Sequence, residues 1–258
     1  MSTADLLLYE FPCNEKIRTY LRLESLFRRY DWFCEQESAI AHQAGISALF
    51  DLLDATARSD LRHELIQELE RRRQRLNAIA AGSESWDDVR DTLVEISNAI
   101  SAVADSVGRT TQRVRENQWL QVIRTRQSIA GGTCEFDLPQ LHLWMNMAPE
   151  VRREELRGYV STLAPIRQAV SLLLRMLRDS SRVQSLTAEN GTYQFSMNRT
   201  QNCALAQLWL PSDCTVVPEV SANKYMLWIR FSRPDENHKL HLVRTEAIGF
   251  RLGLCTLT

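Results

Sequence analysis

The segment WDDVRDTLVEISNAISAVADSV, residues 86–107, decides the architecture of the first part of the chain. Its apolar residues recur at alternating spacings of three and four: Trp86, Val89, Leu93, Ile96, Ile100, Val103 and Val107. This spacing places them along one stripe of an α-helix. The preceding stretch, residues 59–79, carries Leu61, Leu65, Leu69, Leu76 and Ile79 between a capping Ser59 and Gly82-Ser83. We therefore predict a long antiparallel helical hairpin, whose narrow apolar seam also suits contact between subunits.

Helical patterns continue on both sides of this hairpin. Asn14 suits the N-cap of a first helix, and a second helix is expected from Ser38 to Ala57. Another helix is predicted from Thr111 to Ile129, where a glycine pair follows shortly. Its expected inward side chains are Val114, Trp119, Val122 and Ile123. Three prolines suit the first turn of further helices, with Asp137 in capping range of the first: Pro139, Pro149 and Pro165.

Near residue 182 the sequence changes from helical patterns to short runs that are typical of β-strands. Residues 183–187 and 192–197 flank Asn190-Gly191, which is the favoured two-residue turn of a β-hairpin. Further strands are expected at residues 204–210, 225–231, 240–245 and 248–257. We therefore predict an α+β fold. An α-helical domain, residues 1–181, precedes a small, mostly antiparallel β-rich domain, residues 182–258.

The composition of the chain argues against several classes of protein function. The 258 residues contain 31 Lys and Arg against 32 Asp and Glu, a net charge of −1, which argues against a general nucleic-acid binder. The six cysteines form no C-x-x-C pair and do not cluster with the histidines, so no zinc site and no cofactor are expected. Scattered cysteines suit a reducing cytosol. Because no signal peptide or long apolar run is visible, we predict a cytoplasmic protein without membrane insertion.

Catalytic motifs are weak. Cys134 lies eight residues before His142, and a cysteine with a histidine is the pair that a cysteine hydrolase would need. The interpretation that we favour is a buried structural cysteine at position 134. No G-x-S-x-G elbow and no phosphate-binding loop occur. Paired carboxylates fall in expected helix first turns, where they complement the helix dipole. We predict that the protein is not an enzyme.

Positive charge is concentrated in two segments. Residues 14–30 hold five basic side chains against two acids, and residues 109–130 hold five against one. Either segment alone is most simply a solvated helical face. If both helices face one surface, they form a basic cleft that binds an acidic or carboxylate-ended peptide through arginine forks. His142 would add a pH-dependent donor, and Trp119, Trp144 or Trp228 an apolar contact.

Several stretches resemble one family closely. They are residues 11–24, the pair Arg115-Glu116, residues 124–143 with the run Ser-Ile-Ala-Gly-Gly, and residues 222–231. Together they resemble the ZapD family of Z-ring-associated proteins. The resemblance implies a non-enzymatic, cytoplasmic homodimer that is recruited to the Z-ring at mid-cell. It also implies that this dimer binds the C-terminal tail of FtsZ, cross-links and bundles FtsZ protofilaments, and promotes Z-ring assembly during cell division.

The resemblance also carries a set of tail-binding positions. By matching motifs, the residues implied are Arg18, Arg22, Arg124, Arg126, His142, Lys224 and Arg230. The sequence departs from the family pattern at Gln118 and Met226, where some relatives carry arginine. No metal and no cofactor is implied. The alternative function left open is a nucleic-acid-binding protein that uses the arginine-rich helices.

Overall fold

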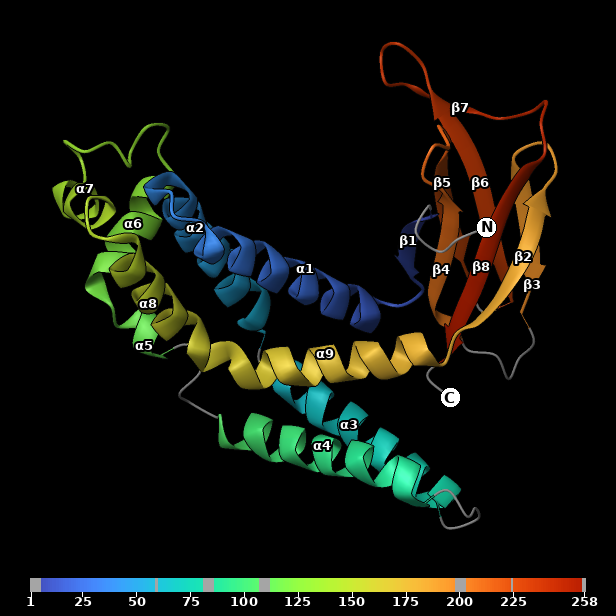
Figure 1. The fold of residues 1–258 in the computed structure, drawn as a ribbon, viewed down its shortest axis with the longest axis horizontal. Coiled ribbons are helices and arrows are strands. Elements are labelled where there is room, and N and C mark those ends of the chain that lie inside the picture. Colours follow the sequence, from blue (N-terminus) through green and yellow to red (C-terminus); the bar gives the residue numbers. More distant parts are fainter. Residues whose placement is uncertain are drawn as a thin grey trace. The chain divides into compact units, whose positions relative to one another are not determined.

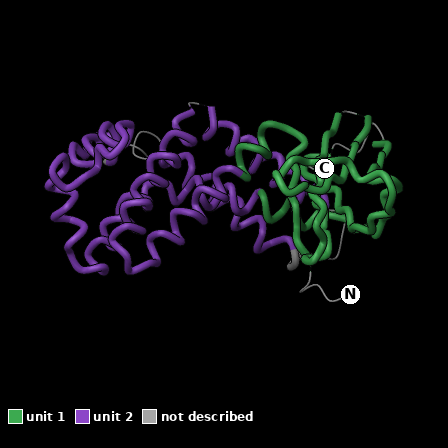
Figure 2. Tube along the Cα trace, turned by 90° about the horizontal axis from the view of Figure 1, so that it is seen from above, with its two compact units in different colours: residues 1–21, 174–258 green, residues 22–173 purple. Residues whose placement is uncertain are grey.

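The computed structural model describes residues 6–58, 60–80, 86–106, 112–197, 203–223 and 225–256. Helices fill the first part of the chain and antiparallel strands the last, so the predicted α+β class is confirmed (Figure 1). The chain divides into two compact units, which are residues 22–173 and the combination of residues 1–21 with 174–258 (Figure 2). The separation into independently folding domains, 1–181 and 182–258, stays a prediction.

The helices have the following bounds. They are α1 (Glu15–Glu35), α2 (Ala39–Thr56), α3 (Leu61–Ala80), α4 (Trp86–Asp105), α5 (Gln112–Arg115), α6 (Gln118–Gln127), α7 (Pro139–Met145), α8 (Pro149–Val160), the 3-10 turn η2 (Ser161–Leu163) and α9 (Ala164–Asp179). The predicted N-cap at Asn14 is confirmed, and Ser38, where the second helix was expected to begin, caps α2. Asn14 accepts the Ile17 N–H at 2.9 Å, and Ser38 accepts the Ala41 N–H at 3.5 Å.

The predicted helical hairpin is confirmed in α3 and α4, which lie side by side in Figure 1. Leu61, Leu65 and Leu69 of α3 are fully buried, as are Ile96 and Val103 of α4. These residues are the ones that the sequence spacing placed on the inner stripes. The predicted cap at Ser59 and the turn at Gly82-Ser83 lie outside the described residues.

The single helix predicted from Thr111 to Ile129 was wrong. Within the described residues the segment forms α5, a break at Asn117 and then α6. The cause is local, because the Asn117 side chain accepts the Leu120 N–H at 3.1 Å and so starts a new helix. Val122 was expected to point inward but is 50% exposed. Asp137 does not cap α7, whose N-cap is Leu138.

The strands build two stacked antiparallel sheets in the other unit. Their bounds are β1 (Leu6–Pro12), β2 (Arg182–Ala188), β3 (Thr192–Ser196), β4 (Cys203–Pro211), β5 (Val217–Ala222), β6 (Met226–Pro234), β7 (Leu240–Leu242) and β8 (Ile248–Thr256). In the described residues one sheet has the order β1-β4-β8-β2, and the other has β3-β6-β5 with β7 beside β6. The sheets share one core, in which the rings of Phe231 and Phe250 lie 5.2 Å apart.

Three features of the strands differ from the sequence prediction, and the first is β5 (Val217–Ala222), a strand that the sequence did not predict. No strand was predicted before the first helix, but β1 pairs with β4 from Leu6↔Pro211 to Pro12↔Leu205. The predicted hairpin around Asn190-Gly191 was also wrong, because β2 pairs with β8 and β3 with β6. The turn itself is present, with φ of 52° at Asn190 and 66° at Gly191. It carries the chain from one sheet to the other, so that both strands direct apolar side chains into the shared core.

Candidate functional site

The predicted tail-binding residues fall into three groups. Arg22, Arg124, Arg126 and His142 belong to the unit of residues 22–173, and Arg18 and Arg230 belong to the other unit. Lys224 lies outside the described residues. The six described side chains are all exposed or half-buried, as a binding role requires.

Two aspartates on α2 form ion pairs with arginines of α1 and α6. Asp51 and Asp54 are one turn apart on α2. Asp51 forms an ion pair with Arg29 of α1, and Asp54 forms one with Arg124 of α6. Arg124 also lies over the Phe50 ring, 5.6 Å from its centroid. Arginines from two helices that are far apart in the sequence therefore lie over one face of α2.

Arg22 extends this row along α1. It lies seven residues, or two helical turns, before Arg29 and so on the same face of α1. We call Arg22, Arg29 and Arg124 the α2 basic row. The ion pairs of Arg29 and Arg124 are exposed on both sides, and such pairs contribute about 0–1 kcal/mol. A carboxylate from a partner can therefore replace Asp51 or Asp54 at small cost.

Arg126 and His142 lie on either side of the segment between α6 and α7. Arg126 pairs with Asp137 at 3.6 Å, and the His142 Nδ1 lies 3.3 Å from the Glu135 carboxylate. Both acids belong to this connecting segment, and all four side chains are at least one-third exposed. These pairs are also weak and open to exchange with another carboxylate.

An aromatic groove lies beside the same helices. Trp119 of α6 and Trp144 of α7 meet with ring centroids 5.5 Å apart, and Trp144 donates to Glu155 of α8 at 2.7 Å. The groove has a volume of about 280 Å³, and Leu143 at its side is 63% exposed. Trp119 lies two turns before Arg126 on the same face of α6. The apolar wall of the groove and a predicted tail-binding arginine thus lie on the same face of α6, two turns apart.

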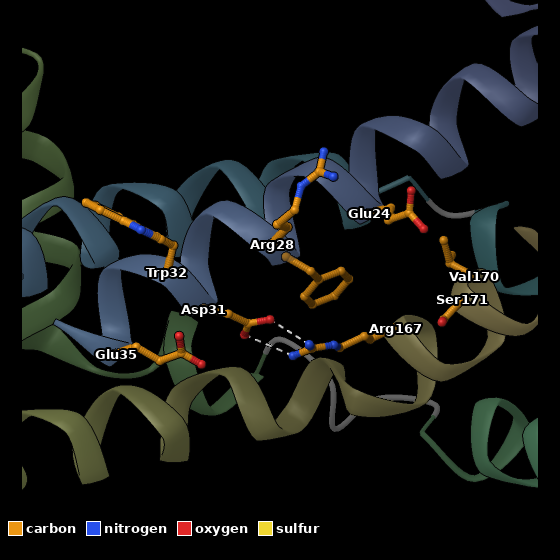
Figure 3. A pocket seen from close by; sticks show the side chains of 9 residues that line it. Glu24, Arg28, Asp31, Trp32, Glu35, Arg167, Val170 and Ser171 are labelled. Atoms are coloured by element: carbon orange, nitrogen blue, oxygen red, sulfur yellow. Dashed lines mark hydrogen bonds and ion pairs between the residues drawn. The ribbon is translucent and has the colours of Figure 1, made fainter. Parts of the chain in front are cut away.

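A second groove, between α1 and α9, differs in charge (Figure 3). Its centre is a two-bond ion pair between Arg167 and Asp31, with distances of 3.0 and 2.5 Å, and Arg167 also stacks over Phe27 at 5.5 Å. Glu24 and Glu35 add two further carboxylates to the lining. Two arginines, Arg28 and Arg167, line this groove, but Arg167 is paired with Asp31 and three carboxylates share the lining. Because acids outnumber arginines there, the groove does not suit an acidic peptide.

The remaining predicted residues lie in the unit with the sheets. Arg18 pairs with Glu15 at 3.2 Å on the first turn of α1. Arg230 of β6 lies 3.5 Å from Glu219 of β5 and, with Trp228, lines an open groove of about 610 Å³. Both arginines are exposed, and their ion pairs are weak for the same reason as those around α2.

Cys134 and His142 both lie at the surface of the helical unit. Cys134 is exposed, so its interpretation as a buried structural cysteine was wrong. The Nδ1 of His142 faces Glu135, the residue after Cys134. Among the described residues, no group of three or more His, Cys, Asp and Glu side chains is arranged to hold a metal ion. In the same residues, no helix is both long enough and apolar enough to cross a lipid bilayer.

Comparison with known proteins gives the same family that the motifs suggested. The profile of the ZapD family, described as "Cell division protein", matches residues 21–230. The chain belongs to the ZapD family of cell division proteins. The chain is 38% identical to cell division protein ZapD of Dechloromonas aromatica, over 98% of this chain and 100% of the relative.

Two further ZapD relatives match at similar levels. The protein from Nitrosomonas europaea is 40% identical over 96% of this chain and 95% of its own length. The protein from Bordetella pertussis is 38% identical over 98% of this chain and 99% of its own. Each carries the name of a cell division protein, so the family resemblance and the cell-division role predicted from the sequence are confirmed.

Two parts of this ZapD-family surface escaped the sequence analysis. The first is the pair Asp51 and Asp54, which organises the α2 basic row. Their spacing of three residues put them on one face of α2, but nothing in the sequence indicated that this face meets both α1 and α6. The second is the groove between Trp119 and Trp144, because a tryptophan at helical spacing is equally typical of a core.

Proposed function

We propose that this ZapD-family protein binds the C-terminal tail of FtsZ, cross-links and bundles FtsZ protofilaments, and so promotes Z-ring assembly. The observation that carries the proposal is the α2 basic row, in which Arg29 of α1 and Arg124 of α6 are gathered on one face of α2 by exposed, weakly bound acids. Arg22 extends the row, and Arg18, Arg126, His142, Lys224 and Arg230 are the further tail-binding positions of the proposal.

The tail would bind by carboxylate exchange. Its acidic groups replace Asp51, Asp54 or Asp137 as partners of the arginines, whose planar guanidinium groups accommodate a carboxylate with two parallel hydrogen bonds. An apolar side chain of the tail enters the groove between Trp119 and Trp144. Tryptophan and arginine are enriched among the few residues that supply most of the binding energy of a protein interface.

Bundling follows from having more than one site per particle. We propose a homodimer, which carries two identical basic surfaces related by its symmetry axis. Each surface binds one tail with modest affinity, and the many tails along a filament raise the effective concentration, so weak sites give stable cross-links. No covalent chemistry and no cofactor is needed. The protein would act in the cytoplasm and be recruited to mid-cell at the Z-ring through these contacts.

Co-sedimentation with polymerised FtsZ tests the proposal. Intact FtsZ should pellet this protein and form bundles, while FtsZ lacking its C-terminal tail should do neither. Equal pelleting with both would move the contact to the globular domain of FtsZ and contradict the basic-row argument. Binding to duplex DNA that falls steeply with salt, without binding to FtsZ, would support the nucleic-acid alternative.

The aromatic groove makes a second prediction. Replacing Leu143 with serine should weaken tail binding by roughly 3- to 10-fold, because a 63% exposed side chain contributes to the groove and little to the core. Titration of a labelled FtsZ tail peptide, followed by fluorescence anisotropy, measures this. Val94→Ser is the matched control, because Val94 is 53% exposed on α4, away from the groove. Equal affinity of Leu143→Ser and wild type would remove the groove from the tail-binding site.

A further inference from the structure

Two thiols meet where β1 ends and β4 begins. Cys13 directly follows β1, Cys203 is the first residue of β4, and their sulfur atoms lie 3.5 Å apart. The backbone of Cys13 is held at this place because its N–H donates to the carbonyl oxygen of Ala204 at 2.9 Å. Both side chains are only half-buried. The two sulfurs are therefore neighbours in the folded protein and within reach of a small solute.

We propose that Cys13 and Cys203 form an oxidation site, which closes to an intramolecular disulfide on reaction with a hydroperoxide. A disulfide needs the sulfurs to approach from 3.5 Å to about 2.05 Å. This inference concerns the unit that contains the sheets and does not rest on the proposed binding of FtsZ.

The environment distinguishes the attacking sulfur from the resolving one. The hydrogen bond between the two thiols lowers the pKa of Cys13, so Cys13 is the first of the two to ionise. The same contact, together with burial, raises the pKa of Cys203, which keeps its proton. Since the thiolate is the reactive form of cysteine, Cys13 is the sulfur that meets the oxidant.

The reaction proceeds in two balanced steps. The Cys13 thiolate attacks one peroxide oxygen and the O–O bond breaks, which gives a sulfenic acid on Cys13 and a hydroxide that takes up a proton to become water. The Cys203 sulfur then attacks the Cys13 sulfur, the S–O bond breaks, and the departing hydroxide takes the Cys203 proton as a second water. The two thiols lose two electrons, and these reduce one peroxide.

The other cysteines provide internal comparisons. Cys255 is buried, donates to the Gln207 side-chain oxygen at 3.4 Å, and has a pKa that burial raises to about 11. Cys34 is also buried, and burial again raises its pKa to about 11. Both should react slowly. Cys134 is exposed and lies in the helical unit, so its oxidation reports that the oxidant has reached the protein.

The disulfide would constrain a large part of the chain. It closes a loop from residue 13 to residue 203, which contains the whole unit of residues 22–173. A bond that closes a long loop restricts the unfolded chain most, so it stabilises the native state through the loss of unfolded conformations. We expect the thermal midpoint of the unit with the sheets to rise by roughly 5–10 °C on oxidation and to fall back on addition of a dithiol reductant.

The test uses the full-length protein treated with hydrogen peroxide. After the remaining thiols are alkylated, the protein is digested without reductant and its peptides are identified by mass spectrometry. We expect a linked peptide that joins Cys13 to Cys203 in the wild type and in Cys134→Ser, and its loss in Cys203→Ser. Absence of that peptide from samples in which Cys134 has been oxidised would overturn the proposal. A peptide that instead links Cys13 to Cys255 would also contradict the assignment.

Discussion

Replacing Arg22 with glutamate is expected to weaken binding of the FtsZ tail by about 10- to 100-fold, without unfolding the protein. The reason is electrostatic, because the change removes one member of the α2 basic row and places a negative charge where a carboxylate of the tail should approach. Arg22 is exposed, so its replacement disturbs little packing. Titration of the tail peptide measures the affinity, and circular dichroism checks that the helices are retained.

Arg28→Glu is the matched control for this experiment. Arg28 lies on the same helix, is exposed, and undergoes the same change of charge, but it belongs to the lining of the other groove, whose carboxylates come from Glu24, Asp31 and Glu35 (Figure 3). We expect Arg28→Glu to alter tail affinity by less than about 3-fold, the size of a long-range effect of net charge. Equal losses in the two variants would mean that the tail responds to total charge, and not to the row over α2.

The wild type and the Arg22→Glu variant should also differ in how their affinity for the tail depends on salt. Contacts between exposed charges are screened within about 10 Å at moderate ionic strength, so wild-type affinity should fall as salt rises. The Arg22→Glu variant should lose part of this dependence, since it has one favourable charge contact fewer. A wild-type affinity that does not change with salt would contradict a site built from arginines.

The helices were predictable from the sequence because their signals are local. A period of 3.6 residues in the apolar side chains, Asn14 and Ser38 at the caps, and proline at the starts of α7, α8 and α9 each act within one or two turns. The break at Asn117 is local as well, but a polar residue in the middle of a helical pattern does not by itself indicate a new cap.

The strand arrangement was less predictable because it depends on distant partners. β1 pairs with β4 across roughly 195 residues of chain, and a short apolar run at the start of a sequence gives no sign of such a partner. Asn190-Gly191 correctly indicated a tight turn, but the turn joins two sheets instead of closing a hairpin. Local turn chemistry therefore does not determine which strands pair.

The candidate site, like the strand pairing, depends on contacts between residues that are distant in the chain. The sequence indicated which segments are basic, but the α2 basic row exists only because Asp51 and Asp54 meet arginines from α1 and α6. These contacts join residues that are about 20 to 70 positions apart in the chain. No alternation or motif spacing encodes a contact of that kind, so the row could be recognised only once the helices were packed.

The largest effect on stability is expected from Arg152→Ala, which should lower the free energy of unfolding by about 3–5 kcal/mol. The Arg152 side chain is buried, with 4% exposure, and donates to the carbonyl oxygens of Glu37, Met145 and Met147 and to the Nδ1 of His42. It therefore joins the turn before α2, α2 itself and the end of α7 to α8. Removing it leaves three carbonyl oxygens and one ring nitrogen without this donor in a buried place.

Arg153→Ala provides the comparison for the same helix turn. Arg153 is half-buried and donates to two carbonyl oxygens, of Cys34 at 3.1 Å and of Gln36 at 3.4 Å. Because water can replace these bonds, we expect a loss of only about 1 kcal/mol. Urea denaturation followed by circular dichroism measures both variants. Equal stabilities of Arg152→Ala and Arg153→Ala would show that the buried hydrogen-bond network does not hold these helices together.

His42 adds a pH dependence to the same network. Its Nδ1 accepts from Arg152 at 3.0 Å, while its Nε2 lies 3.3 Å from the Cys34 carbonyl oxygen, so the neutral ring with a proton on Nε2 fits both contacts. Burial, and to a smaller extent the charge of Arg152, lower the pKa of His42 below the ordinary 6.5. Below pH 6.5 the unfolded chain therefore binds a proton that the folded protein resists.

The sign of the effect follows from this difference in proton binding. The stability that neutral His42 contributes is fully present above pH 6.5 and is lost as the pH falls toward the lowered pKa of the folded protein. We expect the free energy of unfolding of the wild type to decrease on acidification, and His42→Gln to show a smaller decrease over the same range. Parallel pH profiles of the two proteins would exclude His42 as the titrating group.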